Sequence, residues 1–177
     1  MNTISSGKHD FNVKTTRCPE TRNMTNKSHQ ITIRAATPGD HPGWLALRRA
    51  LWPDLSDALQ RDEMKAWLAR PDGIVLIAVE ATAGSRVVGF AEVGTRSVAD
   101  GCESSPVAYL EGWCVDAGMR RRGIGAALVR AAEDWARAKG LREFASDAEL
   151  ANTLSQHAHG ALGFKEVGRS VLYVKVL

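Results

Sequence analysis

Apolar residues after position 30 follow two spacings, one typical of strands and one typical of helices. Residues 30–34 alternate polar and apolar side chains, and the runs 73–80, 86–93 and 108–115 are largely apolar, so each segment predicts a strand. The run 73–80 is apolar at nearly every position, which predicts a strand covered on both faces, and residues 83–85 connect it to its hairpin partner. Shorter segments at 142–146 and 170–176 predict two further strands.

Helical spacing marks four other segments. The first, capped by Asp40, ends at Trp52 because Pro53 follows, and one of its faces carries Trp44, Leu47, Arg48 and Leu51. Ser56 or Asp57 can cap the second, and residues 123–139 and 152–162 predict the third and fourth. The resulting order, β-α-α-β-β-β-α-β-α-β, predicts a single α/β (α+β) domain.

Composition supports one globular domain and argues against several other classes. The 177 residues suffice for one full core, and 44% of them are hydrophobic and 24% charged. No apolar run approaches the roughly 18 residues that a membrane span needs, and the N-terminus lacks the apolar core of a secretory signal. The cysteines, Cys18, Cys102 and Cys114, suggest neither a disulfide framework nor a metal site, so we expect no metal and a reducing, cytoplasmic setting.

The net charge of +3 lies entirely in the first 30 residues. These residues carry five basic and two acidic side chains, so the rest of the chain sums to zero. The same segment is poor in apolar residues, which predicts a disordered extension over residues 1–29 and a folded domain over residues 30–177. A dispersed charge without interleaved aromatic residues is weak support for nucleic-acid binding. We therefore expect neither a nucleic acid nor a membrane as partner.

A turn rich in glycine and arginine, between the strand 108–115 and the helix 123–139, carries the clearest chemical signal. It reads Arg-Arg-Arg-Gly-Ile-Gly-Ala at 120–126. A helix N-terminus presents free N–H groups and the positive end of the helix dipole, glycine allows a close approach, and arginine adds charge-assisted hydrogen bonds. These properties suit a diphosphate, although ordinary strand-to-helix turns with a solvated basic cluster share the spacing.

Two motifs together resemble those of the GNAT acetyltransferases. Arg120-x-x-Gly123-x-Gly125 follows a strand, Leu-Gly-Phe stands at 162–164, and the order of elements over residues 31–177 is similar to that family. Further segments resemble motifs of the aminoglycoside 6'-N-acetyltransferases: Leu-Arg-Arg-Ala-Leu-Trp at 47–52, Ser-Ser-Pro at 104–106, Leu-Glu-Gly at 110–112, Glu-Phe-Ala-Ser-Asp at 143–147, and Asn152. The resemblance implies the GNAT fold, in which a mixed, mostly antiparallel sheet is splayed around acetyl-CoA and flanked by helices. It also implies a homodimer.

The resemblance implies an acetyl-CoA site along the strand 108–115 and the turn after it. Trp113, Cys114 and Val115 would bind the pantetheine arm through their backbone, with the Val115 amide as oxyanion donor, and Asn152 would bond the pantetheine. The turn would hold the pyrophosphate through Arg120, Arg121, Arg122, Gly123, Ile124, Gly125 and Ala126.

An aminoglycoside is a polycation, so its site must be acidic. The candidates at strand ends or in loops are Glu92, Asp100, Glu103, Glu111 and Asp147. Glu111 lies within a strand, an unusual place for a charge unless it faces a pocket, and the resemblance covers both Glu111 and Asp147, so we expect these two to bind the drug. Glu92 is the candidate to accept the proton of the attacking amine or to bridge to water, with Asp147 as a second catalytic carboxylate. Asp100 and Glu103 are expected to be plain loop acids, and Trp52 resembles a substrate-contacting tryptophan.

Three positions depart from the family pattern. His159 replaces a tyrosine that protonates the leaving thiolate in many members, and because histidine can donate a proton near neutral pH, it is the candidate general acid. Val98 replaces a substrate-contacting tyrosine, and Gly168 replaces a glutamate. The drug preference is therefore expected to shift, whereas the coenzyme site is unaffected.

The predicted reaction is direct attack of an aminoglycoside 6'-amine on the thioester of acetyl-CoA in a ternary complex. The product amide has lost one positive charge, which weakens binding to ribosomal RNA and implies antibiotic resistance. Two alternatives remain open. One is a GNAT enzyme for another amine, such as a polyamine or a protein N-terminus; the other is a non-enzymatic module that senses acetyl-CoA or binds nucleic acid through the basic tail.

Overall fold

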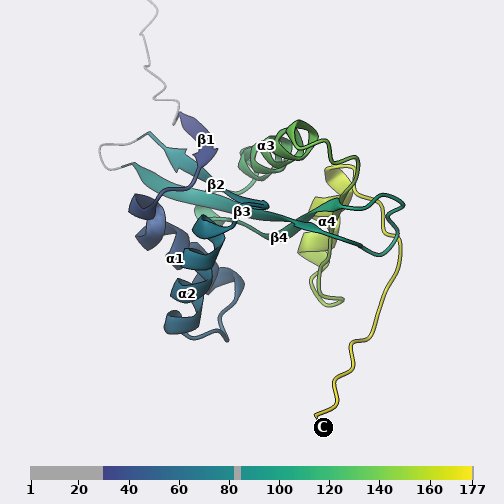
Figure 1. Ribbon diagram of the computed structural model, residues 1–177. Coiled ribbons are helices and arrows are strands. Elements are labelled where there is room, and N and C mark those ends of the chain that lie inside the picture. Colours follow the sequence, from purple (N-terminus) through teal and green to yellow (C-terminus); the bar gives the residue numbers. More distant parts are fainter. Residues whose placement is uncertain (1–29, 82–84, 177) are drawn as a thin grey trace, which may run out of the picture.

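The computed structural model describes residues 30–81 and 85–176, which form a five-stranded sheet with helices on both faces (Figure 1). The elements are β1 (Ile31–Ala35), α1 (His41–Leu51), α2 (Asp57–Ala69), β2 (Gly73–Glu80), β3 (Arg86–Arg96), β4 (Val107–Val115), α3 (Ile124–Ala138), β5 (Phe144–Ser146) and α4 (Thr153–Ala161), with short 3-10 turns at Pro38–Asp40 and Ala117–Met119.

The predicted extension over residues 1–29 and part of the predicted connection at 83–85 lie outside the described residues. No helix within the described residues combines the length and the apolar character needed to cross a membrane.

The strands pair in the order in which they occur along the chain. β1 to β4 form three antiparallel pairs, and β5 joins the edge of β4 in parallel. This arrangement confirms the mixed, mostly antiparallel sheet predicted from the sequence.

Alternate side chains of β2 enter two separate cores. Leu76 and Ala78 pack toward α3, whereas Val75 and Ile77 pack toward α1 and α2 on the opposite face. Figure 1 shows α3 on one side of the sheet and the α1–α2 pair on the other. β2 is therefore buried on both faces, as its continuous apolar run predicts.

Asp40 is the N-cap residue of α1, as predicted, but its side chain makes no capping hydrogen bond to that helix. Its Oδ2 instead accepts hydrogen bonds from the backbone N and the Oγ1 of Thr37, both at 2.8 Å, and the carboxylate also receives the Arg34 guanidinium at 2.7 and 2.8 Å. The Arg34 hydrogen bonds are the largest cause that lowers the pKa of Asp40 to about 2. Because Arg34 lies on β1, this pair ties the turn before α1 to the sheet. The Ser56 side chain does cap α2, accepting from the backbone N of Leu59 at 3.3 Å.

The strand predicted over residues 170–176 does not form. Leu172, Tyr173 and Val174 are 90%, 92% and 95% exposed, and this segment runs away from the body of the protein (Figure 1). A strand requires a hydrogen-bonding neighbour, and no strand of the described chain lies alongside these residues. The prediction of a strand here is therefore wrong for the described chain, and the apolar side chains of the segment are exposed.

Candidate active site

β4 separates from β5 at Glu111, and this separation opens the sheet. β4 pairs with β5 over residues 108–110 only. Toward β3, the residues on either side of Glu111 pair with the adjacent residues Glu92 and Val93, so Glu111 is an extra residue in a β-bulge. A bulge bends its strand and redirects a side chain. Beyond it, residues 111–115 continue beside β3 and have no strand of the described chain on their other side.

The open edge of β4 meets the requirements of an extended pantetheine arm. Trp113, Cys114 and Val115, the residues predicted to bind that arm, all lie on this edge. Backbone N–H and C=O groups that point away from β3 face the gap rather than another strand, and an amide-containing arm can bond to such groups as an added strand does. The geometry of β4 therefore fits the coenzyme predicted from the sequence.

Trp113 packs against both helices that flank the gap. A Cβ on Gly125 would lie 2.7 Å from Cζ2 of the Trp113 ring, so the first turn of α3 rests directly on this indole. On the other side, the Trp113 and His159 rings meet edge to face with centroids 5.7 Å apart. Glycine at 125 is thus required by a close approach, and Trp113 sets the position of α3 relative to the open edge.

The turn before α3 has the geometry of an anion site. Gly123, the N-cap, has a φ of 77°, in the left-handed region that favours glycine, and the first α3 hydrogen bond runs from Ala127 N to Gly123 O at 2.9 Å. The amides of residues 124–126 precede this bond and have no acceptor in the helix. The turn also carries three exposed arginines, and Nε of one of them, Arg120, donates to the Val115 carbonyl at 3.1 Å. The predicted pyrophosphate residues therefore adjoin the end of the open β4 edge.

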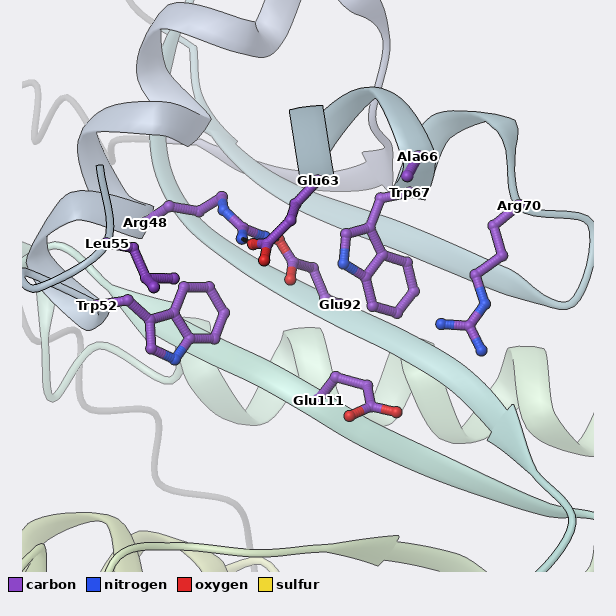
Figure 2. A pocket seen from close by; sticks show the side chains of 9 residues that line it. All are labelled: Arg48, Trp52, Leu55, Glu63, Ala66, Trp67, Arg70, Glu92 and Glu111. Carbon is purple, nitrogen blue, oxygen red and sulfur yellow. Dashed lines mark hydrogen bonds and ion pairs between the residues drawn. The ribbon is translucent and has the colours of Figure 1, made fainter. Parts of the chain in front are cut away.

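A pocket of about 440 Å³ lies between the two N-terminal helices and the bulged part of the sheet (Figure 2). It brings together three of the residues predicted to contact substrate, Trp52, Glu92 and Glu111. The full lining is Arg48, Trp52, Leu55, Glu63, Ala66, Trp67, Arg70, Glu92 and Glu111. The lining comprises three carboxylates, two arginines and four aromatic or apolar side chains. The carboxylates and the aromatic walls suit a ligand with ammonium groups on a sugar-sized frame.

Glu92 is buried in the middle of β3, whereas the sequence placed it at a strand end. The difference arises because β3 continues to Arg96. Oε1 of Glu92 accepts hydrogen bonds from the Arg48 guanidinium and, at 3.0 Å, from Nε1 of Trp44. Arg48 also binds the carboxylate of Glu63, and Figure 2 shows both carboxylates converging on its guanidinium between two tryptophan rings.

Burial raises the pKa of Glu92 to about 7, and the attraction and hydrogen bond of Arg48 oppose that rise only in part. A carboxyl group with a pKa near neutrality can exchange a proton at physiological pH. The second oxygen, Oε2, points toward β4 and lies 3.5 Å from the position of a Cβ on Gly112. Glu92 thus combines a suitable pKa with a direction toward the open part of the sheet.

Glu111 and Asp147 are linked through two side chains that sequence reasoning did not single out. The Arg96 guanidinium forms two hydrogen bonds with the Glu111 carboxylate, from Nε and NH2. It also stacks on the Tyr109 ring, 3.3 Å from the centroid, and the hydroxyl of Tyr109 donates to Asp147 at 2.7 Å. The two carboxylates predicted to bind drug therefore belong to one connected cluster.

The other predicted residues border a larger hollow of about 1450 Å³ beside β5 and α4. Asp147, Val98 and His159 line it, and Val98 is 75% exposed. The predicted substrate residues are thus divided between two adjacent spaces, and Arg96, which lines the larger one and binds Glu111 in the smaller one, stands between them.

His159 lies where β5 ends and β4 turns away. Its Nδ1 donates to the Ser155 carbonyl at 2.8 Å, and its Nε2 is 3.0 Å from Oγ of Ser146, which is itself 3.1 Å from the Leu110 carbonyl. The ring thus lies beside Trp113 at the start of the gap. A proton donor here would be close to the predicted thioester, and its role as general acid stays a prediction.

Two of the motifs that resemble those of the aminoglycoside 6'-N-acetyltransferases, at 104–106 and 143–147, contact each other in the structure. The Glu143 carboxylate accepts hydrogen bonds from the backbone N of Glu103 and from the backbone N and Oγ of Ser104. These bonds lower the pKa of Glu143 and fasten the loop between β3 and β4 to the start of β5. Because Asp147 directly follows β5, this attachment also positions Asp147.

Asn152 and Cys114 each have a structural role beside the predicted one. Oδ1 of Asn152 caps α4 by accepting from Ser155 N at 3.0 Å, so a bond to the pantetheine would fall to its amide nitrogen. Burial raises the pKa of the Cys114 thiol, which keeps it protonated. A protonated thiol is a weak nucleophile, in agreement with direct attack by the amine.

Arg48 is a site residue that the sequence signalled indirectly. It shares the apolar face of α1 with Trp44, and a charge on a buried face requires a partner. The partner itself, Glu92, is 44 residues away and could not be identified from that rule. The Arg96 and Tyr109 contacts carried no such signal, because they depend on the register around the bulge.

Comparison with known proteins agrees with this geometry. A model described as Acetyltransferase (GNAT) family matches residues 44–164. An aminoglycoside N(6')-acetyltransferase type 1 of Klebsiella aerogenes is 44% identical over 149 residues, which cover 82% of this chain and 96% of the relative.

Two solved structures extend the likeness to three dimensions. The aminoglycoside N-acetyltransferase AAC(6')-Iy in complex with CoA is 34% identical with a TM-score of 0.80, covering 86% of this chain and 99% of the other. AAC(6')-Iy in complex with the bisubstrate analog CoA-S-monomethyl-acetylneamine is 36% identical with a TM-score of 0.77, covering 84% and 99%. The splayed sheet, the glycine turn and these similarities agree: the chain belongs to the GNAT acetyltransferase family and, within it, to the aminoglycoside N(6')-acetyltransferases.

Proposed function

We propose that this protein transfers the acetyl group of acetyl-CoA to the 6'-amine of aminoglycoside antibiotics and thereby confers resistance to them. One observation carries the proposal: the open edge of β4 adjoins a pocket lined by carboxylates, so a thioester and a polycationic amine can meet at the bulge. The names of the relatives, and the complex of AAC(6')-Iy with an analog that joins CoA to an aminoglycoside, support it.

Acetyl-CoA supplies an activated acyl group, and this chain's residues would hold it in two places. Backbone groups of Trp113, Cys114 and Val115 would bind the pantetheine arm, and the first-turn amides of α3, with the arginines before them, would bind the pyrophosphate. The Val115 amide, at the end of β4, would stabilise the oxyanion.

The amine side of the reaction would use the acidic pocket. Glu111 and Asp147 would bind ammonium groups, and Trp52 would offer an apolar wall to a sugar ring. Glu92 would accept the proton of the attacking amine, directly or through water, since its pKa of about 7 permits it to act at physiological pH. His159 would return a proton to the leaving thiolate.

Thiol release with a kanamycin-class drug tests the activity, and NMR of the product locates the acetyl group. Glu111→Gln and Asp147→Asn should each raise the KM for drug by about tenfold or more, because a contact between a carboxylate and an ammonium group is lost, while the Kd for acetyl-CoA stays within about twofold of wild type. Equal losses for both substrates would contradict the assignment to the drug side. Acetylation of peptides or polyamines without acetylation of kanamycin or tobramycin would support another amine as substrate.

We also propose that the protein works as a homodimer in the cytoplasm, where acetyl-CoA and the ribosome are present. Five apolar side chains close to the C-terminus support the dimer: Val171, Leu172, Tyr173, Val174 and Val176 are each at least 69% exposed. A contiguous apolar surface of this kind is typical of a protein interface, and a second copy would cover it.

A further inference from the structure

Arg96 occupies a place that has the properties expected of a drug-ammonium subsite. Its guanidinium donates hydrogen bonds to both carboxylate oxygens of Glu111 and lies on the face of the Tyr109 ring, 3.3 Å from the centroid. A carboxylate together with an aromatic face is also what binds an ammonium group of a ligand. In the structure, the guanidinium of Arg96 itself occupies this position between Glu111 and the Tyr109 ring.

The same guanidinium lies between the two carboxylates assigned to the drug. It is bonded to Glu111, and Tyr109, on which it stacks, donates its hydroxyl to Asp147 at 2.7 Å. The hydrogen bonds to Glu111, together with the negative charges of Glu111 and Asp147, raise the pKa of the Arg96 guanidinium. While Arg96 remains in place, it neutralises negative charge that the incoming polycation needs.

Arg96 is accessible to an incoming ligand. It is the last residue of β3, at the border of the loop 97–106, and its side chain is 43% exposed. Partly exposed ion pairs contribute little to stability, so a ligand with several ammonium groups can replace one of the partners at small cost. The long side chain can then extend into the larger hollow that it already lines.

We propose that Arg96 competes with the substrate: its guanidinium occupies the Glu111 subsite and is displaced by an ammonium group of the drug, so that Arg96 sets drug affinity. This proposal rests on the proposed function, because it assumes a polycationic substrate at Glu111. It assigns Arg96 as a specificity-determining residue that weakens binding, whereas an arginine that only orients Glu111 would strengthen it.

The sign of the effect of Arg96→Gln on drug affinity is therefore the test. We expect the KM for kanamycin, and its Kd by titration calorimetry in the presence of CoA, to fall by about threefold to fivefold, as the loss of a partly exposed competing ion pair predicts. The KM for acetyl-CoA should stay unchanged. Arg96→Lys, which keeps the charge but not the two-pronged contact, should lie between wild type and Arg96→Gln.

Arg49→Gln is the matched control. Arg49 also makes a two-pronged contact with a carboxylate, that of Asp57, but on the exposed surface of α1 and α2. Because it removes the same charge away from the pocket, it should leave the KM for drug unchanged.

The outcomes separate this proposal from the proposed function. If wild type releases thiol with kanamycin but Arg96→Gln binds the drug equally or more weakly, the competitor role of Arg96 is wrong and the enzyme assignment stands. If wild type neither binds nor acetylates any aminoglycoside, both proposals are wrong. If Arg96→Gln loses affinity for acetyl-CoA, its fold is damaged, and Arg96→Lys decides: an unchanged or higher KM for drug in that variant overturns the proposal.

Discussion

A single buried carboxyl group, Glu92, connects the chemistry of the site to the stability of the protein. It is held by Arg48 and Trp44 inside the α1 side of the sheet, yet burial raises its pKa to about 7 from an ordinary 4.5. Folding therefore makes protonation of the Glu92 carboxyl group more favourable. Such groups are concentrated at functional sites, which agrees with a role in accepting a proton.

The raised pKa of Glu92 predicts a pH-dependent stability that Glu92→Gln removes. Because the folded-state pKa lies above the unfolded one, the protonated group stabilises the fold fully below pH 4.5, and this contribution is lost as the pH rises through 7. Relative to Glu92→Gln, the wild-type free energy of unfolding should fall by about 3 kcal/mol between those pH values. Urea denaturation at a series of pH values measures it.

The pH dependence of activity tests the pKa of Glu92 independently of stability. In wild type, kcat/KM should rise with pH with an apparent pKa near 7, and Glu92→Gln should lose that rise together with most of the activity. Asp62→Asn, which removes an exposed carboxylate of α2, is the control for charge. A difference in stability between wild type and Glu92→Gln that does not vary with pH would count against the raised pKa.

Among the elements, strands and helices with regular spacing were predictable, whereas the bulge was not. The alternation of polar and apolar residues along β1 and the continuous apolar run of β2 predict which side chains are buried. The apolar residues of α1, spaced three and four apart, predict its buried face in the same way. A bulge adds one residue to a strand, and its only trace in the sequence was a charge, Glu111, within an apolar run. The position of β5 and the gap beside β4 follow from that residue, so the shape of the site required three-dimensional information.

Gly125 tests whether the contact between α3 and Trp113 positions the coenzyme. A methyl group at 125 would lie 2.7 Å from the indole, so Gly125→Ala should displace the first turn of α3 and weaken acetyl-CoA binding by about tenfold or more. Titration calorimetry with acetyl-CoA measures the change. Gly160→Ala is the matched control, because no atom of the described residues lies within 4 Å of a Cβ there and alanine favours the helix. Comparable losses in both variants would show that the Trp113 contact is not the cause.

At the scale of the whole molecule, the C-terminal segment is apolar and yet exposed. Its apolar residues predicted a strand, and they favour burial, but the described chain provides no neighbouring strand. An apolar pattern indicates that burial of a segment is favourable, and it does not identify the molecule that would provide the surface. The wrong prediction of a strand within the chain and the proposed dimer therefore have the same physical origin.

Val174→Asp tests the dimer. A charge at the most exposed apolar position of the segment would have to be desolvated at an interface, so sedimentation should show a dimer for wild type and a monomer for the variant. Leu59→Asp, at an exposed apolar position on α2, should leave the dimer intact. A wild-type protein that sediments as a monomer at micromolar concentration would contradict the proposed assembly.

The extra residue in β4 has a consequence for how this protein can change over time. Glu111 lines the pocket proposed for the antibiotic, and the same bulge leaves open the strand edge predicted for the coenzyme, so an insertion or deletion there would alter both halves of the reaction together. On the opposite wall, α2 contributes Ala66 and Trp67, which take no part in the bulge, whereas its Glu63 binds Arg48 and is thereby linked to Glu92. Substitutions at Ala66 and Trp67 are therefore expected to alter the fit to different aminoglycosides while the strand edge predicted for the coenzyme stays unchanged.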